Sequence, residues 1–210
     1  IVTVRIRDES ADPVDVVDER VEHTVREVRR VIGDAIIAEN DRPLPANVIE
    51  RLRQRRQRLA VVESCTGGTL GQMLTAIAGS SDVFVGGWIT YSNDMKASSV
   101  GVPLELLAAH GAVSAEVAQA MSKGGLDLSG ADHALAISGV AGPGGGSNEK
   151  PVGTVWISLA SRDQPPDVRC FRIPGEREAV RIWSAITALL MLDQRLRAVG
   201  PARLLRQTTP

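Results

Sequence analysis

The chain has 210 residues, of which 43% are hydrophobic and 23% are charged, and its formal net charge is −1. This composition is typical of a soluble globular protein, and the length leaves room for one full domain with an appendage. The apolar runs fall short of the ~20 residues that a membrane helix needs, and a net charge near zero argues against nucleic acid or a membrane as a partner.

The first part of the chain predicts a partial α+β appendage. Apolar and polar residues alternate over residues 2–6, which indicates a strand with one buried face. Apolar residues then recur at helical spacing over residues 14–32, and Gly33 follows as a helix-ending residue. Residues 35–38 are a short apolar run that indicates a second strand.

A polar segment with two prolines, residues 40–45, predicts a linker. Asn47 could cap a following helix that extends to residue 59. This helix contains a strongly basic run, residues 51–58. A solvated helix face explains the run better than a nucleic-acid contact does, because no aromatic residue is interleaved to stack on bases.

From residue 59 onward, strand and helix patterns alternate, which favours an α/β fold with a layered sheet. The last ten residues, 201–210, lack such a pattern and are predicted to be a loose tail. The expected strands span residues 59–62, 83–90, 134–137, 154–160 and 168–173, and the expected helices span residues 69–77, 104–109, 114–126 and 178–196.

The segment Glu-Ser-Cys-Thr-Gly-Gly, residues 63–68, lies between a short apolar strand and a helix. A strand–turn–helix unit places small polar side chains at the carboxyl edge of a sheet, where α/β proteins bind ligands. The N–H groups at the helix start favour an anion or a developing oxyanion. Either Ser64 or Cys65 could therefore be a nucleophile, although a helix cap by Ser64 or Thr66 would explain the same residues.

The segment Tyr-Ser-Asn-Asp-Met-Lys, residues 91–96, follows an expected strand and contains the only tyrosine of the chain. A serine nucleophile needs a base, and none of the three histidines lies in a recognisable triad setting. Lys96 can serve instead if burial lowers its pKa, so that the neutral amine is accessible. A helix start capped by Asn93 or Asp94 is the alternative interpretation.

The central region, residues 61–160, contains 17 of the 20 glycines, three lysines and no arginine. Its Gly-rich loop at residues 138–147 follows a buried strand and could cradle a phosphate through backbone N–H groups. The loop is neither a Walker loop nor a dinucleotide-binding fingerprint. A flexible surface loop is the alternative interpretation.

Arg177 lies in the first turn of the expected C-terminal helix, after Gly175 and Glu176. A cation at this place opposes the positive end of the helix dipole. This misfit suggests that Arg177 faces a ligand anion, whereas a surface ion pair with Glu176 is the alternative.

The two cysteines, Cys65 and Cys170, are too few for a disulfide framework, and no secretory segment is recognisable at the start. A reducing cytoplasm is therefore the expected location. No spacing of His, Cys or Asp indicates a metal site, so neither a metal nor another cofactor is expected. The chain begins with Ile1 inside an apolar alternation, and we expect it to be a piece of a longer polypeptide.

In combination, several segments resemble the C-terminal domain of the CinA family (competence/damage-inducible protein), whose stand-alone form is the PncC-type nicotinamide-nucleotide amidase. The resemblance extends over residues 46–197 in uninterrupted order. The segments that carry it are residues 63–68, residues 91–93 with Lys96, residues 138–143 (Ser-Gly-Val-Ala-Gly-Pro) and residues 150–156 (Lys-Pro-Val-Gly-Thr-Val-Trp).

The resemblance implies a three-layer α/β/α sandwich for residues 46–200, followed by the tail at residues 201–210. Residues 1–45 resemble the end of the small KH-like middle domain of full-length CinA, together with a linker. They contain no Gly-x-x-Gly nucleic-acid loop, so nucleic-acid binding is not expected. A homodimer or a larger homo-oligomer is left open.

The resemblance also implies an activity, the hydrolytic deamidation of nicotinamide mononucleotide to nicotinate mononucleotide and ammonia, without a metal. By motif position, Ser64 is the nucleophile, Lys96 is its base and Ser138 assists the hydroxyl network, while backbone N–H groups near Gly67 hold the oxyanion. The loop at residues 142–146 would close over the nucleotide. The substrate-binding residues implied in this way are Thr66, Gly67, Gly68, Tyr91, Gly139, Gly142, Gly144, Gly145 and Arg177.

Two other classes of function are open at this point. A non-catalytic nucleotide sensor would use the same Gly-rich loops for binding alone and would not turn the mononucleotide over. An interaction module of a larger CinA protein would use the front helix and would lose partner binding without residues 1–45.

Overall fold

The computed structural model describes residues 4–33, 36–39, 41–199, 204 and 206–208. The chain divides into two compact units, Ile1–Asp41 and Arg42–Pro210. The boundary between them lies within the polar segment at residues 40–45 that the sequence marks as a linker.

The first unit contains one helix, α1 (Val14–Ile32), among its described residues, as the apolar spacing predicts, and no side chain of this helix is buried. Arg20 ties the helix to the preceding segment through ion pairs with Asp8 and Asp12, at 2.9 and 2.8 Å. The described residues of both expected strands, 4–6 and 36–38, are not in a strand; residues 1–3 and 35 lie outside the described residues. Apolar alternation alone does not form a strand, because its backbone groups also need a pairing partner.

The second unit forms a six-stranded sheet in the order β2-β1-β3-β4-β5-β6 within the described residues. β1 pairs in parallel with both β2 and β3, whereas the pairs β3–β4, β4–β5 and β5–β6 are antiparallel. The strands are β1 (Leu59–Glu63), β2 (Phe84–Ile89), β3 (His133–Gly139), β4 (Thr154–Ser161), β5 (Gln164–Arg172) and β6 (Gln207–Thr208).

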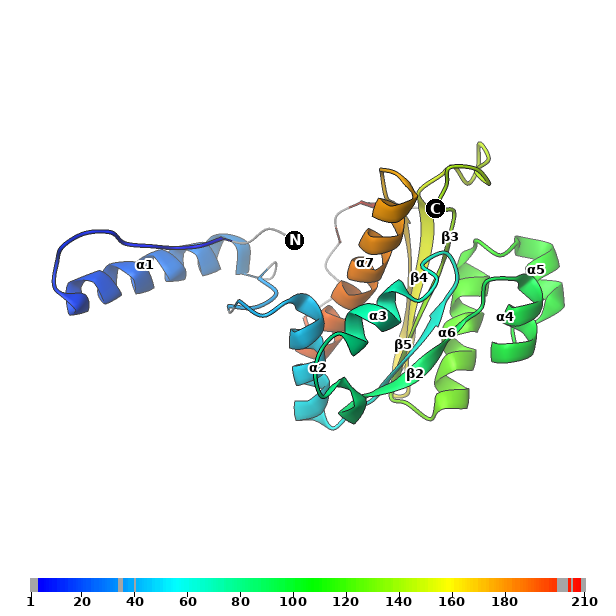
Figure 1. Cartoon of the computed structure of the whole chain (residues 1–210), viewed down its shortest axis with the longest axis horizontal. Helices are drawn as coiled ribbons and strands as arrows, with labels where there is room; N and C mark the ends of the chain where they lie inside the picture. Colours follow the sequence, from blue (N-terminus) through cyan, green and yellow to red (C-terminus); the bar gives the residue numbers. More distant parts are fainter. Residues whose placement is uncertain (1–3, 34–35, 40, 200–203, 205, 209–210) are drawn as a thin grey trace. The chain divides into compact units, whose positions relative to one another are not determined.

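Helices cover both faces of this sheet, which confirms the three-layer α/β/α fold (Figure 1). α6 packs across strands β1 to β5 together with α4 and α5, and α7 packs on the opposite face with α2 and α3. None of the helices in the described part of the chain combines the length and apolarity that a membrane crossing needs. The helices of this unit are α2 (Leu44–Arg55), α3 (Thr69–Thr75), the short 3-10 helix η2 (Ser80–Asp82), α4 (Asn93–Val100), α5 (Leu104–His110), α6 (Ala115–Ser129) and α7 (Arg177–Arg197).

The central strands β1 and β3 are the most deeply buried part of the unit. All five residues of β1 and the first six residues of β3 are buried. Strands with helices on both faces read as continuous apolar runs rather than as alternating ones, which is why both were recognisable in the sequence. The carboxyl ends of these rigid strands therefore offer a fixed platform for a site.

Helix α2 begins earlier than predicted. It starts at Leu44 with Pro45 in its first turn, and Asn47 lies inside the helix instead of capping it. A proline in the first helical turn loses no hydrogen bond and has a backbone angle suited to a helix, so the two prolines of the expected linker start this helix. The side-chain amide of Asn47 donates back to the Arg42 carbonyl at 3.1 Å.

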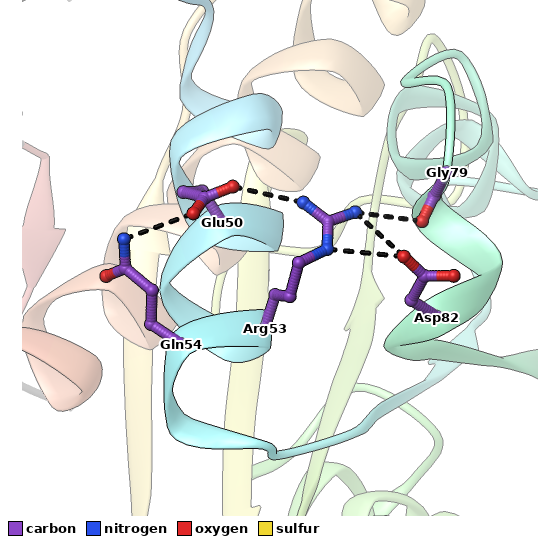
Figure 2. Close-up of polar contacts among 5 residues, drawn as sticks. All are labelled: Glu50, Arg53, Gln54, Gly79 and Asp82. Carbon is purple, nitrogen blue, oxygen red and sulfur yellow. Dashed lines mark hydrogen bonds and ion pairs between the residues drawn. The ribbon is translucent and has the colours of Figure 1, made fainter.

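The basic run on α2 makes internal contacts and is not merely a solvated face. Arg53 donates to the carboxylates of Glu50 and Asp82 and to the carbonyl of Gly79, and so joins α2 to the segment around η2 (Figure 2). Arg51 pairs with Asp193, a buried residue of α7. The contacts of these arginines hold elements of the fold together.

The prediction that residues 201–210 form a loose tail is wrong for residues 207 and 208. Gln207 and Thr208 form β6, which pairs with Phe171 and Cys170 of β5. A two-residue strand is too short to show a periodic pattern in the sequence. This pairing covers part of the edge that β5 would otherwise present.

Candidate active site

Several of the singled-out segments meet at one edge of the sheet. Because β1, β2 and β3 are parallel, their carboxyl ends point the same way. Glu63 pairs in register with Ile89 of β2 and Ile137 of β3. Ser64, which directly follows β1, therefore lies level with Ser138 near the end of β3, and the segment that carries Lys96 follows β2.

Ser64 and Lys96 are in direct contact. The Lys96 Nζ lies 3.0 Å from the Ser64 Oγ and 2.8 Å from the Thr90 carbonyl oxygen. Lys96 is only 1% exposed and Ser64 8%. The sequence prediction that these two residues, 32 positions apart, act together thus has the geometry that it requires.

Lys96 is positioned by the helix start that the sequence indicated. It lies in the first turn of α4, whose cap is Ser92, one position before the predicted Asn93 or Asp94. The Ser92 hydroxyl oxygen accepts the Met95 N–H at 3.1 Å. The cap sets the direction of the helix and with it the direction of the lysine side chain toward β1.

The surroundings of Lys96 favour its neutral form. Burial lowers the pKa of this amine, and the nearby Cys65 acts in the opposite direction. In the described part of the chain Lys96 forms no ion pair with a carboxylate that would hold it charged. A neutral lysine amine 3.0 Å from a serine hydroxyl can accept its proton.

Cys65 does not have the properties of a nucleophile. Burial raises the pKa of this thiol to about 12, although the charges of Lys96 and Arg177 act in the lowering direction. The reactive species of a cysteine is its thiolate, which this environment disfavours. Of the two candidates left open by the sequence, Ser64 is therefore the one that the local chemistry supports.

Glu63 has a structural role that sequence reasoning missed. This buried carboxylate accepts the backbone N–H groups of Gly68, Leu70 and Gly71, at 3.0, 3.1 and 2.8 Å. It thus occupies the N-terminus of α3 from inside the protein. An acidic residue directly before a strand–turn–helix nucleophile was the available signal, because helix N-termini favour negative charge.

The occupied helix start corrects one predicted role. The Gly67 N–H donates to the Ser64 carbonyl at 3.0 Å, and the Thr69 N–H donates to the Thr66 carbonyl at 3.3 Å. The N–H groups of Gly68 and Leu70 donate to Glu63. These donors are therefore not available to hold an oxyanion. Gly68 has φ +96°, a conformation that glycine adopts without strain, and it lets the chain enter α3.

Thr66 is fully buried, and its carbonyl oxygen rather than its side chain is the group in use. Arg181 of α7 donates to this carbonyl from Nε at 3.1 Å and from Nη2 at 2.9 Å. The Thr66 hydroxyl has no partner among the described residues. Arg181 was not predicted, although it lies one helical turn after Arg177 and so on the same face of α7.

Arg177 and Tyr91 are brought together, as their assignment to one site requires. Arg177 donates to the Tyr91 hydroxyl from Nη2 at 2.7 Å and to the Gly142 carbonyl from Nη1 at 2.8 Å. The arginine thus joins the start of α7 to the segment after β2 and to the Gly-rich loop. Tyr91 is 59% exposed, so its ring is open to a ligand.

The predicted glycines of the Gly-rich loop divide into two groups. A side chain at Gly139 would lie 2.8 Å from the Thr154 carbonyl, so glycine is needed there for close strand packing. Gly144 and Gly145 are exposed at the tip of the loop. No hydrogen bond in the described part of the chain joins either of these two to Ser64 or Lys96.

Ser138 lies near Ser64 along the sheet edge but not in its hydroxyl network. Its hydroxyl donates to the Ala112 carbonyl at 2.5 Å. Within the described residues it makes no hydrogen bond with Ser64 or Lys96, which corrects its predicted role. Side chains alternate between the faces of a strand, and this hydroxyl faces the segment before α6.

Neither histidine of the second unit contacts Ser64 or Lys96 in the described part of the chain. His133 begins β3, at the opposite end of the strand from Ser138, and is buried against Ser161 and Gln57 at 2.8 and 3.2 Å. Burial lowers its pKa to about 4, so it is neutral at physiological pH. His110 lies 3.5 Å from Glu116 on the surface.

Known proteins match most of this chain. A CinA-like protein of Geobacter sulfurreducens is 47% identical over 169 residues, which cover 80% of this chain and 41% of the relative. A CinA-like protein of Myxococcus xanthus is 44% identical over 172 residues, with 82% and 41% covered. The chain therefore spans less than half the length of these curated relatives.

Solved structures show the same fold. The competence/damage inducible protein CihA of Agrobacterium tumefaciens is 40% identical, with a TM-score of 0.71 over 73% of this chain and 93% of its own. A CinA superfamily protein of Klebsiella pneumoniae is 39% identical, with a TM-score of 0.72 over 76% and 99%. The family model described as the CinA C-terminal domain matches residues 41–196. The chain thus belongs to the CinA family and contains its C-terminal domain.

Proposed function

We propose that the second unit hydrolyses the carboxamide of nicotinamide mononucleotide, giving nicotinate mononucleotide and ammonia, with Ser64 as nucleophile and Lys96 as base. The observation that carries the chemistry is the 3.0 Å contact between the Lys96 Nζ and the Ser64 Oγ in a buried setting. The identity of the substrate rests on the motifs that this chain shares with the nicotinamide-nucleotide amidases of the CinA family.

In the first half of the reaction, the Ser64 Oγ bonds to the carboxamide carbon while its proton moves to neutral Lys96. The carbon–nitrogen bond then breaks, and protonated Lys96 returns the proton to the departing ammonia. In the second half, neutral Lys96 takes a proton from water as the water oxygen bonds to the acyl carbon. The ester bond to Ser64 then breaks, Lys96 returns the proton to the Ser64 Oγ, and nicotinate mononucleotide leaves. Water is the only co-reactant that the overall reaction needs.

The developing oxyanion needs donors other than those near Gly67, because these face Glu63 and the Ser64 carbonyl. We assign this role to the N–H groups of Cys65 and Thr66, which directly follow the nucleophile. Neither is among the donors to Glu63. The N–H that follows the nucleophile has the same role in other strand–turn–helix hydrolases.

Arg177 is our candidate for the contact with the nucleotide. Its guanidinium bridges Tyr91 and the Gly-rich loop, and its charge reaches Cys65, the residue after the nucleophile. A guanidinium suits a phosphate group, and an exposed aromatic ring suits a base or a pyridine ring. The exposed Gly144 and Gly145 place backbone N–H groups in the same loop.

The test is ammonia release from nicotinamide mononucleotide by the purified chain. We expect release by the wild type and none by Ser64→Ala. Ser98→Ala serves as a matched control, because its hydroxyl is on the exposed side of α4 and bonds only to the Asp94 carbonyl among the described residues. Activity that survives Ser64→Ala and is lost in Cys65→Ala would contradict the assignment. Binding of the mononucleotide without turnover would instead indicate a nucleotide-sensing module.

A further inference from the structure

Arg181 reaches from α7 into the turn that carries the nucleophile. Its Nε and Nη2 atoms lie 3.1 and 2.9 Å from the Thr66 carbonyl oxygen, and Nη2 also lies 3.1 Å from the Thr69 hydroxyl. The Thr69 hydroxyl in turn donates to the Thr66 carbonyl at 2.7 Å. A single arginine thus binds both the middle of the turn, at Thr66, and the first residue of α3, Thr69.

The contact is made to the backbone, which separates Arg181 from an ordinary ion-pairing arginine. In the part of the chain that the structure describes, Arg181 forms no ion pair with a carboxylate. Its two donors converge on one carbonyl oxygen, and the planar guanidinium holds that geometry with little freedom. Lysine has no such fork, so it cannot hold the carbonyl in the same way.

The turn is held from its other side by Glu63. This carboxylate fixes the N–H groups of Gly68, Leu70 and Gly71, while Arg181 fixes the Thr66 carbonyl. Ser64 lies between the strand that ends at Glu63 and the residue that Arg181 holds. Loss of either contact frees one end of a short segment whose position determines the distance from Ser64 to Lys96.

We infer that Arg181 is a positioning residue for Ser64. It acts through the Thr66 carbonyl to keep the Ser64 Oγ aligned with the Lys96 Nζ, and it does not contact the substrate. The inference rests on the proposed role of Ser64 as nucleophile, but not on the identity of the substrate. A displacement of about 1 Å at a reacting atom can reduce a rate by roughly 100-fold, so the effect should be large enough to measure.

The experiment measures how fast Ser64 reacts with a fluorophosphonate probe in the intact chain. In this reaction the Ser64 Oγ bonds to phosphorus, fluoride leaves and Lys96 takes the hydroxyl proton, so the rate reports the serine–lysine pair without nicotinamide mononucleotide. We expect Arg181→Ala to react at least roughly 10-fold more slowly. Arg181→Lys keeps the charge and one donor, and should regain part of the rate.

Arg53→Ala is the matched control. Arg53 also donates to a backbone carbonyl of another segment, that of Gly79, which lies directly before η2. We expect its probe reaction to match the wild type, and thermal unfolding of all variants shows whether each is folded. In parallel, kcat with the mononucleotide should fall in Arg181→Ala while KM stays within about threefold, since positioning acts on the chemical step.

Each result separates the two proposals. An Arg181→Ala variant that is folded and reacts at the wild-type rate would overturn the positioning role and leave the amidase standing. A large rise in KM with kcat unchanged would also overturn it, because it would mean that Arg181 contacts substrate. If Ser64 reacts with the probe but the mononucleotide is not turned over, the proposed substrate is wrong. The comparison of Arg181→Ala with the wild type would still decide the positioning role. Absence of both reactions in the wild type would overturn both proposals.

Discussion

The chain is held by charged side chains on both sides of helix α3, yet the two sides are built differently. At the N-terminal end, a buried carboxylate, Glu63, accepts three backbone N–H groups, and Arg181 holds the carbonyl of Thr66. On the C-terminal side, in the segment around η2, Arg53 holds the Gly79 carbonyl and the Asp82 carboxylate from a position that is 40% exposed (Figure 2).

The difference shows what each set of contacts is for. Exposed groups such as Arg53 can exchange a lost partner for water, so their contacts add little to stability. Buried groups such as Glu63 cannot replace a lost partner with water, so the loss of a partner is costly. The constrained end is the one that carries Ser64, and the exposed end carries no group of the candidate site.

Replacement of Lys96 should give the largest change in rate at the constrained end. Lys96→Met keeps a long side chain in the buried space but removes the only amine that lies within hydrogen-bonding distance of Ser64 in the described residues. A lost general base reduces rates by roughly 10²- to 10⁴-fold. The measurement is kcat for ammonia release, and a loss of less than about threefold would rule out Lys96 as the base.

The pH profile of the wild type tests the same residue without a substitution. Since burial lowers the pKa of Lys96, its neutral form should appear at a lower pH than for an exposed lysine. Activity should therefore rise with pH through the lowered pKa and level off below the usual range of lysine. A profile that rises only within that usual range would contradict a base prepared by burial.

Replacement of Glu63 should give the largest change in stability. Glu63→Ala leaves buried N–H groups of α3 without an acceptor, at a cost of roughly 3 kcal/mol in the free energy of unfolding. Glu63→Gln keeps one acceptor oxygen and should cost less. Urea unfolding measures both values, and a loss below about 1 kcal/mol in Glu63→Ala would show that water replaces the carboxylate.

The layered fold was predictable because buried strands leave apolar runs in the sequence, and Ser64 follows one of these strands. The pairing of Ser64 with Lys96 was implied by the resemblance to the CinA family, since local patterns alone left Ser64 and Cys65 as alternatives. α2 and β6 were placed less well, since two prolines read as a linker when they in fact start a helix. β6 consists of Gln207 and Thr208 alone, so its pairing leaves no periodic signal.

The remaining contacts of the site join residues that are distant in the sequence. Arg181 and Thr66 are 115 positions apart. Because every residue has a backbone carbonyl, the sequence does not indicate which carbonyl accepts this hydrogen bond. Ser138 was placed correctly at the sheet edge, but the direction of its hydroxyl depends on Ala112, which no motif marks. Sequence motifs thus locate the candidate residues Ser64 and Lys96 better than they locate the groups that hold them.

Replacement of Arg53 should have the smallest effect. Exposed ion pairs contribute about 0.2–1 kcal/mol each and are screened by salt, and the Gly79 carbonyl is held from a side that water can reach. Arg53→Ala should therefore lower the free energy of unfolding by about 1 kcal/mol or less in urea, with a smaller difference at high salt. A loss above about 2 kcal/mol would mean that the exposed segment after α3 is as constrained as the buried turn before it, which would contradict the contrast between Arg53 and Arg181.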